Sequence, residues 1–127
     1  MADQDFETGV AIRERMWGAD SVRARLGEDA DEFMRDFEEL VTRYCFGAVW
    51  GREQLTPAMR SMLTIAMLVA MGRSFQVKLH VRGAVANGVT REQIRELLLH
   101  AAPYCGIPAA LDGFRAAGEA LDEIGAV

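Results

Sequence analysis

The feature that most constrains the fold is a nearly continuous apolar segment in the middle of the chain. From Leu63 to Met71 the only polar side chain is that of Thr64. The segment is too short to span a bilayer, because a membrane-spanning helix needs about 20 apolar residues. A helix without a polar face is buried on every side, so we expect this one in the core or at a subunit interface.

Other segments carry signals for the start and end of helices. Thr56 followed by Pro57 favours the start of a helix, and Thr90 with Gln93 has the spacing of a capping box. Gly88 suits the left-handed position that follows a helix. No stretch alternates between apolar and polar residues as a half-buried strand does. The sequence therefore predicts an all-α fold of six to seven helices.

These helices are expected to form a single domain over residues 1–127. The chain contains no repeat, no low-complexity linker and no break in composition, and its length suits a single core. Apolar residues recur at helical spacing in seven stretches, which predict helices over about 10–17, 20–27, 29–50, 57–71, 74–87, 90–103 and 108–124.

The charge of the chain argues against nucleic-acid and membrane partners. The formal net charge is -5, and the arginines are scattered rather than gathered into a positive stripe. The N-terminus is acidic and lacks a signal-peptide pattern, so a cytoplasmic protein is expected. Cys45 and Cys105 are then expected to be reduced and non-catalytic, because both stand in apolar surroundings where a thiol acts as a small hydrophobe.

A polar stripe follows the apolar segment. A helix over 74–87 places six residues within one sector of about 100°, namely Arg73, Gln76, His80, Gly83, Ala84 and Asn87. The two small residues make the stripe shallow, so a small anionic ligand has room beside His80. A solvated helix face or a hydrogen-bonded structural histidine explains the same pattern, and both alternatives stay open.

Other kinds of site have less support. His80 and His100 are twenty residues apart and no acidic residue stands four positions from His80, so no metal site is expected. The cysteine spacing excludes a Cys-x-x-Cys redox pair, and no glycine-rich loop follows a strand as nucleotide binding would require. His100 lies near the expected C-terminal end of its helix, where an imidazole is mildly favourable, and we interpret it as structural.

Four stretches and a closing phenylalanine together resemble a known family. The stretches read GVAIRERMWG, DFEELVTRY, WGREQLTPAMRSMLTIAMLVAMGR and LHVRGAVANGVTREQIRELLLHAAPYCGIPAA. The last is the most specific, because it combines the histidine, the cap and the spacing of the apolar residues. The chain resembles the carboxymuconolactone decarboxylase family of the alkylhydroperoxidase D-like superfamily, and it is most similar to the stand-alone 4-carboxymuconolactone decarboxylases.

The resemblance implies an all-α subunit that assembles with copies of itself, as a trimer or hexamer. It implies a site that needs no cofactor, is shared between helices near a subunit interface and has His80 as its catalytic residue. A small anionic substrate would contact five residues, namely Arg73, Gln76, Tyr44, Trp50 and Asn87. The peroxidase branch of the superfamily has two cysteines in the turns before the histidine. Here those positions hold Arg73 and Gln76, which argues against a thiol peroxidase.

Several positions depart from the decarboxylase pattern. Gln76 stands where a glutamate is usual, and Ala48 stands in place of a second acid within the segment FGAVW. In the same segment Phe46 replaces a tryptophan, and farther on Leu111 replaces an asparagine. Glutamine has the shape of glutamate but cannot carry a proton at neutral pH. The proton for the reaction must then come from His80, Tyr44 or water.

Three functions follow from these observations. The first is decarboxylation of a carboxylated unsaturated lactone such as 4-carboxymuconolactone, a reaction of aromatic-compound catabolism in the β-ketoadipate pathway. The second is other proton-transfer, lactone or cyclisation chemistry in a biosynthetic pathway, which the missing acids at 48 and 76 favour. The third is a helical binding or scaffold protein that has lost catalysis.

Overall fold

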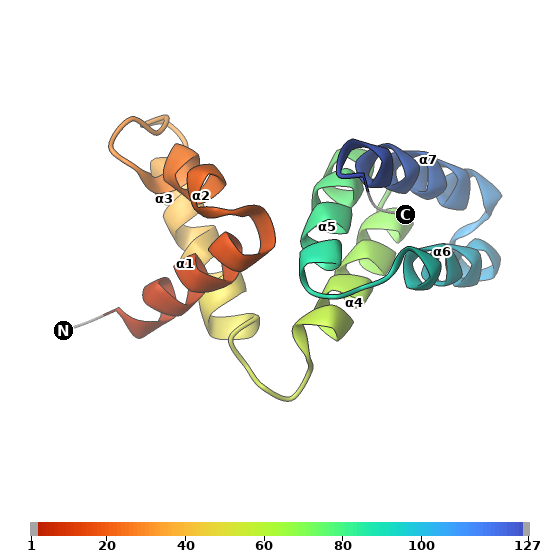
Figure 1. The fold of residues 1–127 in the computed structure, drawn as a ribbon, viewed down its shortest axis with the longest axis horizontal. Coiled ribbons are helices and arrows are strands. Elements are labelled where there is room, and N and C mark those ends of the chain that lie inside the picture. The colour runs from red at the N-terminus through yellow and green to blue at the C-terminus, as the bar shows by residue number, and fades with distance from the viewer. Residues whose placement is uncertain (1–2, 126–127) are drawn as a thin grey trace. The chain divides into compact units, whose positions relative to one another are not determined.

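The computed structural model describes residues 3–125, which form seven α-helices and one π-helix and contain no strand (Figure 1). The predicted all-α fold is therefore confirmed. The chain divides into two compact units, one that ends at Thr56 and one that begins at Pro57. Each unit has its own apolar core and is described by itself below.

The first unit contains four helical elements: α1 (Gln4–Trp17), α2 (Ala19–Leu26), α3 (Arg35–Leu40) and the π-helix η1 (Val41–Val49). The helix expected over 29–50 is correct only in part. It begins at Arg35, and at Val41 the backbone changes from α to π winding. Hydrophobic periodicity does not report a change of winding, because it averages over several turns.

Helices α1 and η1 pack with their backbones in contact. A Cβ atom added to Gly9 would lie 1.9 Å from the carbonyl oxygen of Thr42, and one added to Gly47 would lie 1.9 Å from that of Asp5. No side chain fits at such a distance, so both positions need glycine. The two glycines, one on each helix, set how closely α1 approaches η1.

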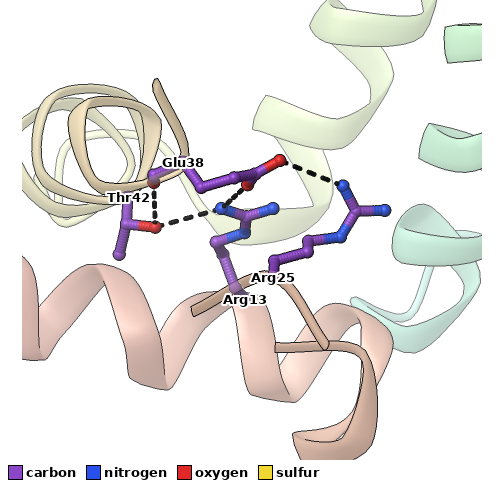
Figure 2. A network of polar contacts seen from close by, with 4 residues as sticks. All are labelled: Arg13, Arg25, Glu38 and Thr42. Carbon is purple, nitrogen blue, oxygen red and sulfur yellow. Dashed lines mark hydrogen bonds and ion pairs between the residues drawn. The ribbon is translucent and has the colours of Figure 1, made fainter. Parts of the chain in front are cut away.

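A buried ion pair lies beside this contact (Figure 2). Arg13 Nη1 of α1 donates to Glu38 Oε2 at 2.9 Å and to Thr42 Oγ1 at 3.0 Å. The Thr42 hydroxyl donates to the Glu38 carbonyl oxygen at 2.7 Å, and Arg25 of α2 pairs with Glu38 Oε1 at 3.4 Å. Arg13 is 5% exposed and Glu38 7%. The network therefore joins α1, α2, α3 and η1, and its central pair, Arg13 and Glu38, is hardly reached by water.

The second unit contains the remaining helices: α4 (Pro57–Ala70), α5 (Ser74–Ala86), α6 (Arg91–Cys105) and α7 (Ile107–Glu123). The capping box of Thr90 and Gln93 is present at the start of α6, and Gly88 has a φ of 90°. The helix expected over 90–103 continues past Pro103 to Cys105.

Helix α4, which carries the apolar segment, has two different sides. Ile65 and Val69 are buried in the core of this unit. Met59, Leu63 and Met67 are exposed, although all three are apolar. The expected burial of this helix on every side is therefore not found, because these three side chains are exposed.

The buried ion pair generates a prediction about stability. Arg13→Met leaves Glu38 buried with only the longer contact to Arg25, and an uncompensated buried charge is costly. We expect the variant to lose about 3 kcal/mol of unfolding free energy, measured by urea denaturation at fixed protein concentration.

Two further variants separate the charge from the packing. Arg13→Met combined with Glu38→Leu removes both charges, and we expect it to recover most of the loss. Arg23→Met breaks the exposed pair with Asp20 and serves as the matched control, with a nearly unchanged urea midpoint. A double variant as unstable as Arg13→Met would contradict the ion-pair account.

Candidate functional site

Three buried residues fix the rotation of helix α5. Val77, Val81 and Ala84 are almost completely inaccessible and belong to the core of the second unit. They recur at spacings of four and three residues and so mark one face of the helix. His80 lies between them in the sequence and is only partly buried.

The residues of the stripe differ in exposure along α5. Arg73 occupies the position before the first turn and is exposed, as is Gln76 in that turn. His80 lies one turn after Gln76, about 6 Å farther along the axis, and is partly buried. The arrangement therefore runs from a solvent-exposed guanidinium to a shielded imidazole.

Burial controls the protonation of His80. Desolvation lowers the pKa of the imidazole from 6.5 to about 4. Burial has this effect because a cation is poorly solvated in the protein interior. The ring is therefore neutral at pH 7 and bears a hydrogen on one nitrogen and a lone pair on the other. The Nδ1 atom is buried, so a ligand could contact the imidazole only through its other atoms.

Asn87 is the last residue of the polar stripe, and it connects the end of α5 to α4. Its Nδ2 donates to Ser61 Oγ of α4 at 3.0 Å, and Ser61 is completely buried. Its Oδ1 is buried and accepts no hydrogen bond from the residues that the structure describes. Sequence reasoning missed Ser61, although a polar residue at the start of an apolar helix is a signal for a buried hydrogen bond.

The shallow part of the stripe is filled by the protein itself. Gly83 and Ala84 are buried, and Ala84 belongs to the core cluster. The expectation that these two residues leave space for a ligand is therefore wrong, because helix packing uses that space. A ligand beside α5 must lie nearer its N-terminal half, toward Arg73, Gln76 and His80.

Tyr44 and Trp50, the other predicted substrate contacts, belong to the first unit. Tyr44 lies on η1 and is 62% exposed. Trp50 follows η1 and packs its ring against Phe46, with centroids 5.6 Å apart. Four of the predicted residues thus lie along α5, with Arg73 and Asn87 at its opposite ends. Tyr44 and Trp50 lie on or next to the π-helix.

The π winding of η1 is itself a feature that sequence reasoning missed. It extends over nine residues, Val41–Val49, and includes Ala48, where the family pattern has an acid. π winding is rare and is often found at functional sites. No residue pattern in this segment distinguishes it from an α-helix, so only the structure could reveal it.

Other classes of site have no support in the described residues. Within 3–125 no three His, Cys, Asp or Glu side chains gather as a metal-binding group. Cys45 and Cys105 are both free and partly buried. No helix in the same range is long and apolar enough to cross a membrane.

Comparison with known proteins finds two similar decarboxylases. The 4-carboxymuconolactone decarboxylase of Acinetobacter baylyi is 34% identical over 123 residues, which cover 97% of this chain and 91% of that protein. The nitrosuccinic acid decarboxylase of Metarhizium robertsii is 38% identical over 107 residues, which cover 84% of this chain and 74% of that protein. The model of the carboxymuconolactone decarboxylase family matches residues 35–119. With this match and these relatives, the chain belongs to the carboxymuconolactone decarboxylase family.

Proposed function

We propose that this protein is a carboxy-lyase that needs no cofactor and acts on a small carboxylate with a built-in electron acceptor. The observation that carries the proposal is the shielded, neutral His80 on α5, about two turns after the exposed guanidinium of Arg73. Membership of a decarboxylase family and two relatives named as decarboxylases support it.

The substrates in the names of the two relatives have one chemical property in common. In 4-carboxymuconolactone, the bond to the departing carboxylate is conjugated through the ring double bond with the lactone carbonyl. Loss of CO2 leaves the electron pair on that carbonyl oxygen as a dienolate. In nitrosuccinic acid, loss of the carboxylate beside the nitro group leaves the pair on the nitro oxygens as a nitronate. A proton then returns to carbon in both reactions.

The substrate itself therefore accepts the electrons, and the protein has three tasks. It must hold a carboxylate, stabilise an oxyanion and deliver a proton. Arg73 is suited to the first task, because a guanidinium binds carboxylates through two parallel hydrogen bonds. Gln76 can donate a hydrogen bond from its amide. His80 serves the other two tasks as a hydrogen-bond donor and proton carrier.

The anionic substrate changes the protonation of His80. A negative charge close to an imidazole favours its cationic form and raises its pKa. The free site thus holds a neutral ring, and substrate binding draws a proton onto it. That proton is available for the carbanion after CO2 has left. The family resemblance also predicts Tyr44 and Trp50 as substrate contacts.

His80 gives the principal functional prediction. The wild-type protein is expected to release CO2 from 4-carboxymuconolactone or from nitrosuccinic acid. His80→Ala should lower turnover by about 100-fold or more, because a positioned proton carrier and oxyanion donor is lost. Turnover is measured as CO2 release, and circular dichroism checks that the helices remain.

Matched variants keep this test decisive. His100→Ala removes the other, exposed histidine and should leave turnover unchanged. His80→Gln retains most of the side-chain volume, so it tests the chemistry if the alanine variant fails to fold. Full activity in His80→Gln would exclude a catalytic role, and no CO2 from either substrate would favour a non-catalytic binding protein.

Gln76 supplies a second prediction. Gln76→Glu places a carboxylate one turn before His80, at the position where the family has an acid. The new charge should stabilise the imidazolium, and we expect decarboxylation of the lactone to rise by about tenfold. Glu96→Gln, an exposed exchange on α6, is the control. A fall in lactone turnover in Gln76→Glu would show that the site is built for a different substrate.

We also propose that the protein is a homo-oligomer, a trimer or hexamer. The exposed apolar side of α4, formed by Met59, Leu63 and Met67, supports this, because burying an apolar surface in a subunit interface is energetically favourable. Sedimentation at micromolar concentration should find the oligomer, and Leu63→Glu with Met67→Glu should dissociate it. A wild-type monomer would contradict the proposal.

A further inference from the structure

A cavity lies between α6 and α7 in the second unit. Its volume is about 130 Å³, and its lining comes from these two helices alone. His80 and the rest of the polar stripe belong to or adjoin α5, so none of them lines it. The proposed decarboxylation makes no use of this cavity.

The inside of the cavity is apolar. Ile94 and Leu98 of α6 and Leu121 of α7 are buried and line it. Phe114 contributes a partly buried aromatic ring. At Gly118 an added Cβ atom would meet nothing within 4 Å, so the missing side chain leaves real space. For comparison, an apolar cavity of about 150 Å³ engineered in another protein accepts benzene.

Two arginines of α6 also line the cavity. Arg91 and Arg95 are both exposed and are four residues apart, so they lie on the same side of the helix. Arg95 makes no ion pair or hydrogen bond with the described residues. The Arg95 guanidinium can therefore pair with an anion at this side of the cavity.

We propose that this cavity binds a small aromatic carboxylate, as a ligand separate from the substrate at His80. The ring would fill the apolar space beside Phe114 and Gly118, where an aromatic pair is favourable. The carboxylate would remain at the exposed side with Arg95, which can bind it through two hydrogen bonds. A pocket with an apolar interior and a few convergent polar groups is typical of small-molecule sites.

Benzoate is the probe, and its binding to the full-length protein is measured by isothermal titration calorimetry. Gly118→Leu should abolish binding, because the new side chain occupies the cavity, and leucine is a good helix former. Arg95→Met should weaken binding by about tenfold, the effect of losing one charge-assisted contact. Arg115→Met, an exposed arginine of α7 outside this cavity, is the control and should bind like the wild type.

Two further measurements separate this site from the one on α5. Benzoate should bind His80→Ala as well as the wild type, and toluene should bind at least about tenfold more weakly than benzoate. Failure of benzoate to bind at millimolar concentration, or binding that survives Gly118→Leu, would overturn the inference. Loss of benzoate binding in His80→Ala would assign the anion to α5, and equal binding of toluene would remove the role of the arginines.

Discussion

The buried ion pair between Arg13 and Glu38 is the interaction on which the first unit depends. It joins α1 to α3, and through Thr42 and Arg25 it also reaches η1 and α2. A pair of this kind adds little net stability over an apolar core, but either charge alone would be costly. It therefore fixes one arrangement of the helices, and the π-helix with Tyr44 lies within that arrangement.

Local signals in the sequence predicted the features that depend on neighbouring residues. The capping box at Thr90, the left-handed Gly88 and the helical class of the fold are of this kind. The pair Arg13–Glu38 joins residues 25 positions apart, and Asn87 reaches Ser61 across 26. Such contacts depend on how helices pack, and neither periodicity nor propensity contains that information.

In the candidate site, too, features set by neighbouring residues could be predicted, and features set by helix packing could not. The helical wheel places Gln76 and His80 on one helix, and both lie on α5, whereas Arg73 stands just before it at the N-cap. It could not predict that His80 is neutral, since the cause is burial by other helices. Nor could it predict that Ala84 lies in the core. The imidazole is consequently neutral in the free protein. Under the proposed function, the negative charge that favours its protonation comes with the substrate.

This account is tested most directly by the titration of the His80 imidazole, followed by NMR in the free protein and with a saturating unreactive dicarboxylate such as succinate. Burial predicts that the pKa is about 4 in the free protein. Nearby negative charge predicts an upward shift when the anion binds, because it stabilises the imidazolium. A pKa near 6.5 in the free protein, or no upward shift with the anion bound, would contradict the account.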